Sequence, residues 1–430
     1  MKNLNVILLF FIIFSISYSS GTINEELIIE TIKQYKIPLK NIENNDSDKN
    51  KLINSFKAKS IIGLGEATHG TDEFFKIRCQ LSKLLINDLD FGVVAIEAGF
   101  QECNNLNEYV LNGTGNPLEL INDLHHWFWK RQEMLDFIEW LREYNLDKKE
   151  GEKVIIAGFD MQWRNQSAKY ISSYLKLHNP GVFASFKNQL DIISSTENVP
   201  LSTTEFEAIQ KIEMELKDWG VLKTDSMNHK EFEITLQNIA VLKQSEPFLA
   251  DRSGEKLIYE KIRDEFMAQN VVWLFNHMGK SGMIIWAHNG HISKGERCGF
   301  AKIICEEAMG NFLKKEYGDE YFPVGFVFNQ GCFNAFSKEK VFKTFCVDEA
   351  PSGTLPYLLS RSQSDKCFID FNQINDTRFV EEFLMKPLKN QSVGTYFVAK
   401  DRFGKIKLKD KYEALIFVDK STKPVYLKEN

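Results

Sequence analysis

Short apolar runs that alternate with long amphipathic segments constrain the fold of this chain most strongly. Six runs, rich in Val, Ile and Phe, have the length and composition of buried strands. They cover residues 60–64, 92–96, 154–158, 283–287, 324–328 and 396–399. Residues 73–87 and 134–144, which lie between them, have the apolar spacing of helices. The alternation predicts an α/β fold, with a mainly parallel sheet flanked by helices in three layers.

One long segment, from about residue 165 to residue 278, breaks this alternation. It has helical periodicity throughout and contains no convincing strand. The chain has 430 residues, of which 43% are hydrophobic, enough to bury a large core. We therefore predict one α/β domain over residues 21–430 that carries a large helical insertion, and we expect the insertion to roof the sheet.

The first twenty residues differ from the rest of the chain. Lys2 is followed by a nearly apolar run over residues 6–16, and Ser17 and Ser19 supply small residues for a cleavage site. This is the pattern of a cleavable signal peptide, and the apolar run is shorter than the roughly 20 residues that span a bilayer. We expect a secreted or periplasmic mature protein without a stable membrane anchor.

Charge and cysteine content exclude some classes of partner and leave others open. The formal net charge is −6 and the basic residues form no stripe, so nucleic acid is not an expected partner. The seven cysteines lack metal-ligand spacing and are too few for a disulfide scaffold. An odd number leaves at least one thiol unpaired within the chain, and the sequence leaves the pairing open.

The segment after the first apolar run carries a candidate general base. Gly65 and Gly70 bracket Glu66 and His69, so the backbone can turn and present both side chains together. A carboxylate can orient an imidazole, and the ordinary pKa of His, about 6.5, suits proton abstraction near neutral pH. The structural alternative is a turn in which Glu66 and Thr68 cap the next helix.

Three other positions place polar groups where apolar runs end. Glu97 closes the second run, and a buried carboxylate there needs a partner, for which Arg78 is the candidate. His288 and His291 follow the fourth run with a glycine between them, a pattern more typical of a site than of structure. Asp160 follows the third run and is either part of this set or a helix cap.

These motifs together resemble the erythromycin esterase family over roughly residues 61 to 328. The matching pieces are Gly65-Glu66-Ala67-Thr68-His69-Gly70, Lys76-Ile77-Arg78, Ala95-Ile96-Glu97-Ala98, Trp127-Phe128-Trp129, Trp140-Leu141-Arg142, Arg263-Asp264-Glu265-Phe266-Met267-Ala268 and Ala287-His288-Asn289-Gly290-His291. The resemblance implies an active site made of Glu66, His69, Arg78, Glu97, His288 and His291.

The resemblance also implies a hydrolase of carboxylic esters, with macrolide lactones as candidate substrates and no metal or cofactor. His69 would activate water, and Glu66 would orient His69. Arg78, His288, His291 and Asp160 are the residues expected to bind the substrate. No G-x-S-x-G elbow supplies a serine nucleophile. Two alternatives remain: a metal-dependent, protease-like hydrolase that uses the His and Glu cluster, and a non-catalytic secreted protein that binds a glycan or small molecule.

Overall fold

The structure is a computed structural model that describes residues 24–40, 42–197, 199–222, 228–250, 256–298 and 305–427. The predicted signal peptide, residues 1–20, lies outside the described residues. Within the described ranges, no helix is both long and apolar enough to cross a membrane.

A nine-stranded sheet forms the centre of the molecule. Its strands follow the order β1-β10-β13-β8-β2-β5-β3-β4, and β9 pairs with an extension of β8. The pairs from β13 through to β4 are parallel, whereas β1, β10 and β9 add antiparallel pairs. The bounds are β1 Ile37–Pro38, β2 Ile61–Leu64, β3 Val93–Gly99, β4 Ile155–Asp160, β5 Met283–Trp286, β8 Tyr321–Phe336, β9 Phe342–Val347, β10 Lys366–Asp370 and β13 Ala414–Ser421. Two small ribbons pair β6 Glu296–Cys298 with β7 Cys305–Glu307, and β11 Leu388–Gln391 with β12 Phe403–Ile406.

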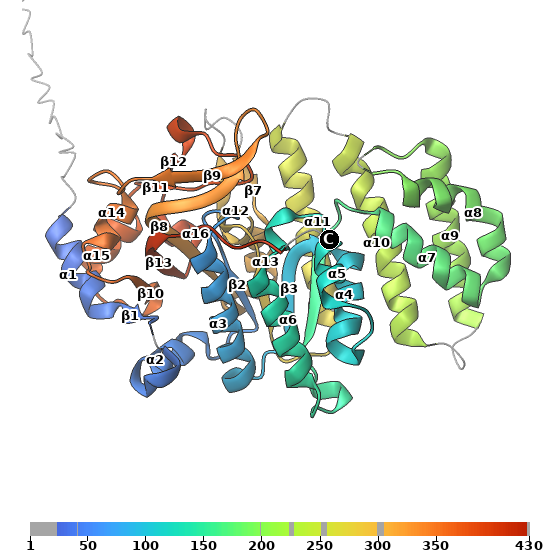
Figure 1. Cartoon of the computed structure of the whole chain (residues 1–430), viewed down its shortest axis with the longest axis horizontal. Helices are drawn as coiled ribbons and strands as arrows, with labels where there is room; N and C mark the ends of the chain where they lie inside the picture. The colour runs from blue at the N-terminus through green and yellow to red at the C-terminus, as the bar shows by residue number, and fades with distance from the viewer. Residues whose placement is uncertain are drawn as a thin grey trace, which may run out of the picture.

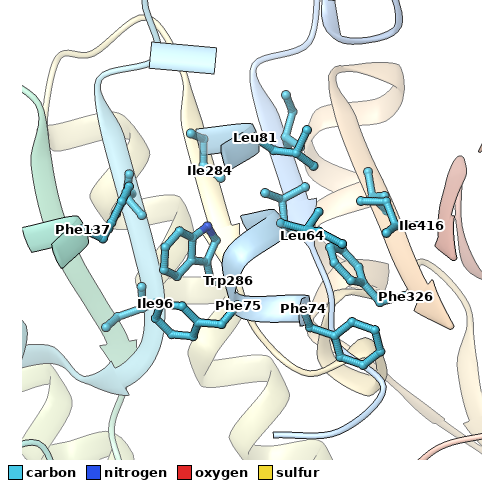
Figure 2. Close-up of a cluster of buried hydrophobic side chains, with 14 of the residues drawn as sticks. Leu64, Phe74, Phe75, Leu81, Ile96, Phe137, Ile284, Trp286, Phe326 and Ile416 are labelled. Atoms are coloured by element: carbon cyan, nitrogen blue, oxygen red, sulfur yellow. The ribbon is translucent and has the colours of Figure 1, made fainter. Parts of the chain in front are cut away.

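Helices cover both faces of this sheet, which confirms the predicted α/β class (Figure 1). Neighbouring residues along a strand point to opposite faces, so Ile62 and Val94 join one apolar core while Ile61 and Val93 join the other. Figure 2 shows the first core, in which Trp286 of β5 packs among side chains of the adjacent strands and of α3 and α6. The helices are α1 Glu25–Tyr35, α2 Asp46–Phe56, α3 Asp72–Leu89, α4 Phe100–Asn112, α5 Pro117–Asn122, α6 Gln132–Asn145, α7 Asn165–His178, α8 Pro180–Ser195, α9 Thr203–Leu222, α10 His229–Ala250, α11 Lys256–His277, α12 Asn289–Ile292, α13 Met309–Tyr317, α14 Leu355–Ser360, α15 Thr377–Phe379 and α16 Leu408–Lys411.

One strand prediction is wrong. Residues 396–399 form no strand, because Tyr396 makes only an isolated bridge to Phe336 before a short 3-10 turn. The C-terminal strand of the sheet is instead β13, which inserts between β8 and β10. The other five predicted strands and both predicted helices are present, with bounds that differ by a few residues except for β8, which is much longer than predicted.

The insertion is helical, as predicted, but it does not roof the sheet. Helices α7 to α10 build an apolar core of their own, in which Trp219 packs against Phe232. They project sideways beyond α4 (Figure 1). Helix α11 then returns and packs against β4, the edge strand. Of the insertion, α11 supplies the side chains that reach the predicted site residues.

The long strand β8 continues past the sheet and pairs with β9 to form an arm, residues 331–347 (Figure 1). A disulfide joins Cys332 to Cys346 at directly opposed positions of the two strands. Cys79, Cys103 and Cys367 are free thiols, in agreement with the expected unpaired cysteine. The disulfide links the two strands at the base of the arm, next to the sheet.

Candidate active site

Four adjacent strands bring the predicted residues to one edge of the sheet. In the order β2-β5-β3-β4, each strand ends next to its neighbour's end, and the polar side chains lie at these ends or in the segments that follow them. The loop after β5 is tied directly to the loop after β2, since the backbone N–H of Asn289 donates to the carbonyl of Glu66 at 2.9 Å. All six residues that the resemblance implies, and Asp160, therefore lie in one region.

Glu66, His69 and Arg78 form a buried chain of hydrogen bonds. Nδ1 of His69 lies 2.7 Å from one carboxylate oxygen of Glu66, and Arg78 donates from Nη2 to the other oxygen at 2.7 Å. The carboxylate therefore favours the tautomer with the proton on Nδ1 of His69, and Nε2 keeps its lone pair. Among the described residues Nε2 has no hydrogen-bond partner. The capping alternative is wrong, because α3 begins at Asp72 with Thr71 as its N-cap.

The side chain of Arg78 is 1% exposed and lies among three aromatic rings. Its guanidinium carbon is 5.4 to 5.6 Å from the ring centres of Phe75, Trp129 and Trp286. Burial alone would raise the pKa of Glu66, but the charge of Arg78 and the bond to His69 outweigh it and lower that pKa. Arg78 thus holds Glu66 ionised, and it is too deeply buried to touch a substrate.

A second arginine fixes the backbone of the same loop. Arg131 is 1% exposed and donates to the carbonyl oxygens of His69, Thr71 and Phe128 at 2.8 to 3.2 Å. The sequence analysis did not single out this residue. Because its three acceptors belong to two separate segments, Arg131 holds the His69 loop against the turn that contains Phe128.

The second cluster of charges surrounds Arg263 of α11. Its Nη2 donates to Glu97 at 2.8 Å and to Asp160 at 2.7 Å, so the expected Arg78–Glu97 pair does not form. Burial alone would raise the pKa of Glu97, but His291 and Arg263 lower it well below its usual range. Burial alone would likewise raise the pKa of Asp160, but Arg263 and His126 outweigh that effect and lower the pKa. Asp160 therefore belongs to the site.

His291 joins this cluster through both ring nitrogens. Nδ1 bonds to a carboxylate oxygen of Asp264, and Nε2 lies 3.0 Å from Nη1 of Arg263. A guanidinium can only donate, so Nε2 of His291 is the acceptor in its hydrogen bond with Arg263. Arg263 and Asp264 belong to the family motif at residues 263–268, but no role was predicted for them from the sequence. Their membership of that motif is the sequence feature that could have identified them.

His288 lies between the two clusters. Its backbone N–H donates to Glu97 at 2.9 Å, its Nδ1 accepts from the N–H of Gly290 at 3.1 Å, and its ring centre is 5.2 Å from that of His69. The proton is therefore on Nε2, which is buried and has no hydrogen-bond partner among the described residues. Burial, with His69 and His291 nearby, lowers the pKa of His288 to about 3. It is a neutral donor at ordinary pH.

The low pKa of His288 should make the protein less stable in acid. An unfolded His288 gains a proton as the pH falls below about 6.5, and the folded imidazole does not until about 3. We expect this group to lower the free energy of unfolding by up to about 1.4 kcal/mol per pH unit across that window. Urea unfolding at several pH values gives the free energy of unfolding as a function of pH. Between about pH 6.5 and 3 this free energy should fall less steeply for His288→Asn than for the native protein. Equal slopes would contradict the assignment.

The acidic side chains of this region already have cationic or imidazole partners. Among the described residues, no group of three or more His, Cys, Asp or Glu side chains has the geometry to hold one. Glu97 and Asp160 already share the cation Arg263, and Asp264 holds His291. A divalent ion there would have to displace the guanidinium from two buried carboxylates.

This combination of a helix-flanked parallel sheet and paired histidine and carboxylate groups at its carboxyl edge is typical of an α/β enzyme. The family model for erythromycin esterase matches residues 86–421, so the chain belongs to the erythromycin esterase family. The match includes Glu97, Asp160, His288 and His291 and begins after Glu66, His69 and Arg78.

Individual relatives agree with this placement. The chain is 24% identical to a putative hydrolase of Bacillus subtilis over 375 residues, 79% of this chain and 80% of that protein. It is 25% identical to erythromycin esterase type II of Escherichia coli over 423 residues, 88% of this chain and 98% of that protein. A solved Bacillus cereus structure superposes with a TM-score of 0.81 at 25% identity, over 94% of this chain and all of the other. The family and these relatives support a hydrolase.

Proposed function

We propose that the protein hydrolyses carboxylic esters with a water molecule that His69 activates, without a metal ion. The observation that supports this proposal most strongly is the hydrogen bonding of the His69 imidazole. Glu66 holds its Nδ1, Arg78 holds Glu66, and Nε2 is left without a partner. An imidazole held in this way has the lone pair and the orientation of a general base.

In the proposed reaction, Nε2 of His69 takes a proton from water while the water oxygen bonds to the ester carbonyl carbon. The carbonyl oxygen becomes an oxyanion, and the unpartnered Nε2–H of His288 is the nearby neutral donor for it. When the intermediate collapses, the bond to the alcohol oxygen breaks and His69 returns its proton to that oxygen. The products are a carboxylic acid and an alcohol.

Glu97, Asp160 and His291 have a supporting role in this proposal. Glu97 accepts from the backbone N–H of His288, which fixes the position of the donor ring. Arg263 neutralises part of the charge on Glu97 and Asp160, and His291 packs against Arg263. Substrate contacts through His288 and His291 remain part of the proposal, whereas Arg78 acts through Glu66.

We also infer that the protein works outside the cytoplasm. The sequence pattern of residues 1–20 supports this, and so does the disulfide between Cys332 and Cys346, since such bonds persist in oxidising compartments. Macrolide lactones are candidate substrates because erythromycin esterase type II is among the relatives.

The proposal can be tested with purified protein, 4-nitrophenyl acetate and a macrolide. We expect hydrolysis of the aryl ester, with a rate that exhaustive chelation leaves unchanged. Elemental analysis should find no stoichiometric zinc. Loss of activity on chelation, restored by zinc, would favour the metal-dependent alternative. Binding of the macrolide without turnover of either compound would favour the non-catalytic alternative.

A further inference from the structure

A group of aromatic side chains lies beside the loop that carries His69. Ring centres of Trp127 and Phe342 are 4.7 Å apart, and each lies 5.8 Å from the ring of Tyr426. Phe336 contacts Phe342 at 5.2 Å and Tyr396 at 6.0 Å. These five rings come from four separate segments of the chain, and we refer to them as the ring patch.

The ring patch is connected to the site at two points. On the arm, Asn334 donates its backbone N–H to the carbonyl of Gly70 at 3.0 Å, and a Cβ at Gly70 would lie 1.9 Å from the carbonyl oxygen of Asn334. On the other side, Trp127 precedes Phe128, whose ring stacks on that of His69 at 4.3 Å and 7°. The ring of Phe128 therefore lies between the patch and the proposed base, in contact with Trp127 at 5.6 Å and with His69.

Two of the five rings are exposed to solvent and the other three are partly buried. Phe342 is 40% exposed and Tyr396 is 49% exposed, while Trp127, Phe336 and Tyr426 are partly buried beneath them. Exposed aromatic surface that gathers in one place, rather than singly, is typical of binding sites. Phe342 pairs with Phe336 in the ladder of the arm and packs against Trp127 and Tyr426, so protein contacts alone place its ring and the surface is preformed.

We propose that the ring patch binds a flat apolar ring of the ester substrate and places the ester bond next to His69. The contacts within the patch are ring against ring, so dispersion and apolar burial would select the substrate. The arm and the turn at Trp127, rather than the helical insertion, would then decide which esters are accepted. This inference deepens the proposed function and rests on it for the position of the ester bond.

The test compares two butyrate esters that differ in the alcohol, 2-naphthyl butyrate and ethyl butyrate. We expect Phe342→Ser to raise KM for the naphthyl ester by about tenfold, the usual order for a lost ring contact with its buried area. KM for ethyl butyrate should not change. Leu177→Ser is the matched control, because Leu177 is a 73% exposed apolar side chain on α7. Equal changes in KM for both esters would overturn the proposal.

A binding measurement separates this inference from the proposed function. In the His69→Asn background, calorimetry should give a Kd for 2-naphthyl butyrate that Phe342→Ser weakens about tenfold and Leu177→Ser leaves unchanged. If the native protein hydrolysed no ester, the proposed function would fail while this comparison still tested the patch. Equal affinities for the two double variants would overturn the ring patch as a binding surface.

Discussion

His69→Asn should lower kcat for ester hydrolysis by about three orders of magnitude, the usual contribution of a general base. The side-chain amide of asparagine can still donate a hydrogen bond to Glu66, as Nδ1 of His69 does. It has no nitrogen in the position of Nε2, so it cannot take a proton from water. The choice of asparagine matters because His69 is only 6% exposed and stacks on Phe128, so alanine would also disturb packing. Steady-state kinetics on 4-nitrophenyl acetate would measure the effect.

Two comparisons make this result specific. His277→Ala changes an exposed histidine at the end of α11 and should leave kcat unchanged. Circular dichroism of His69→Asn should match that of the native protein. If His69→Asn kept more than about a tenth of the native kcat, a general-base role would be excluded at this position.

Arg263→Met should lower the free energy of unfolding by about 3 to 5 kcal/mol, the usual cost of leaving a buried charge without its partner. Glu97 and Asp160 are 3% and 0% exposed, and both share the guanidinium. Methionine keeps much of the side-chain volume and removes the charge. Urea unfolding at neutral pH would measure the loss, and activity should fall as well because Glu97 holds His288.

Neutralising one of the stranded carboxylates should recover part of that loss. Arg263→Met with Asp160→Asn should therefore be more stable than Arg263→Met alone, although Asp160→Asn alone should destabilise the native protein. Arg378→Met, at an exposed position, is the matched control and should change the free energy of unfolding by less than about 0.5 kcal/mol. Additive effects of the two substitutions would contradict a shared charge cluster.

Partner choice in the site illustrates the limits of sequence reasoning. Arg78 was the partner predicted for Glu97, yet it pairs with Glu66, because α3 packs its inner face against β2 and the rings around Trp286. The partner of Glu97 comes from α11, at the far end of the insertion. A periodicity argument places a helix on a face of the sheet but does not say which of its side chains meets which strand end.

The strand pattern at the C-terminus shows the same limit. The run at residues 396–399 has the composition of a strand, but β13 takes the place beside β8 and leaves this run with a single bridge. Amino-acid composition indicates how readily a segment becomes a strand. Whether the segment pairs in the sheet depends on which apolar segment the fold brings beside β8.

The sequence by itself determined the α/β class, the helical insertion and the strand ends at which Glu66, His69, Glu97, Asp160, His288 and His291 lie. It could do so because apolar periodicity is local, and because parallel strands share one carboxyl edge whatever their order. Only the tertiary structure decided that Arg263 joins Glu97 to Asp160, that α7 to α10 extend beside the sheet, and that the arm brings Phe342 against Trp127. Those outcomes depend on contacts between distant segments, whose geometry is set by the packing of the whole chain.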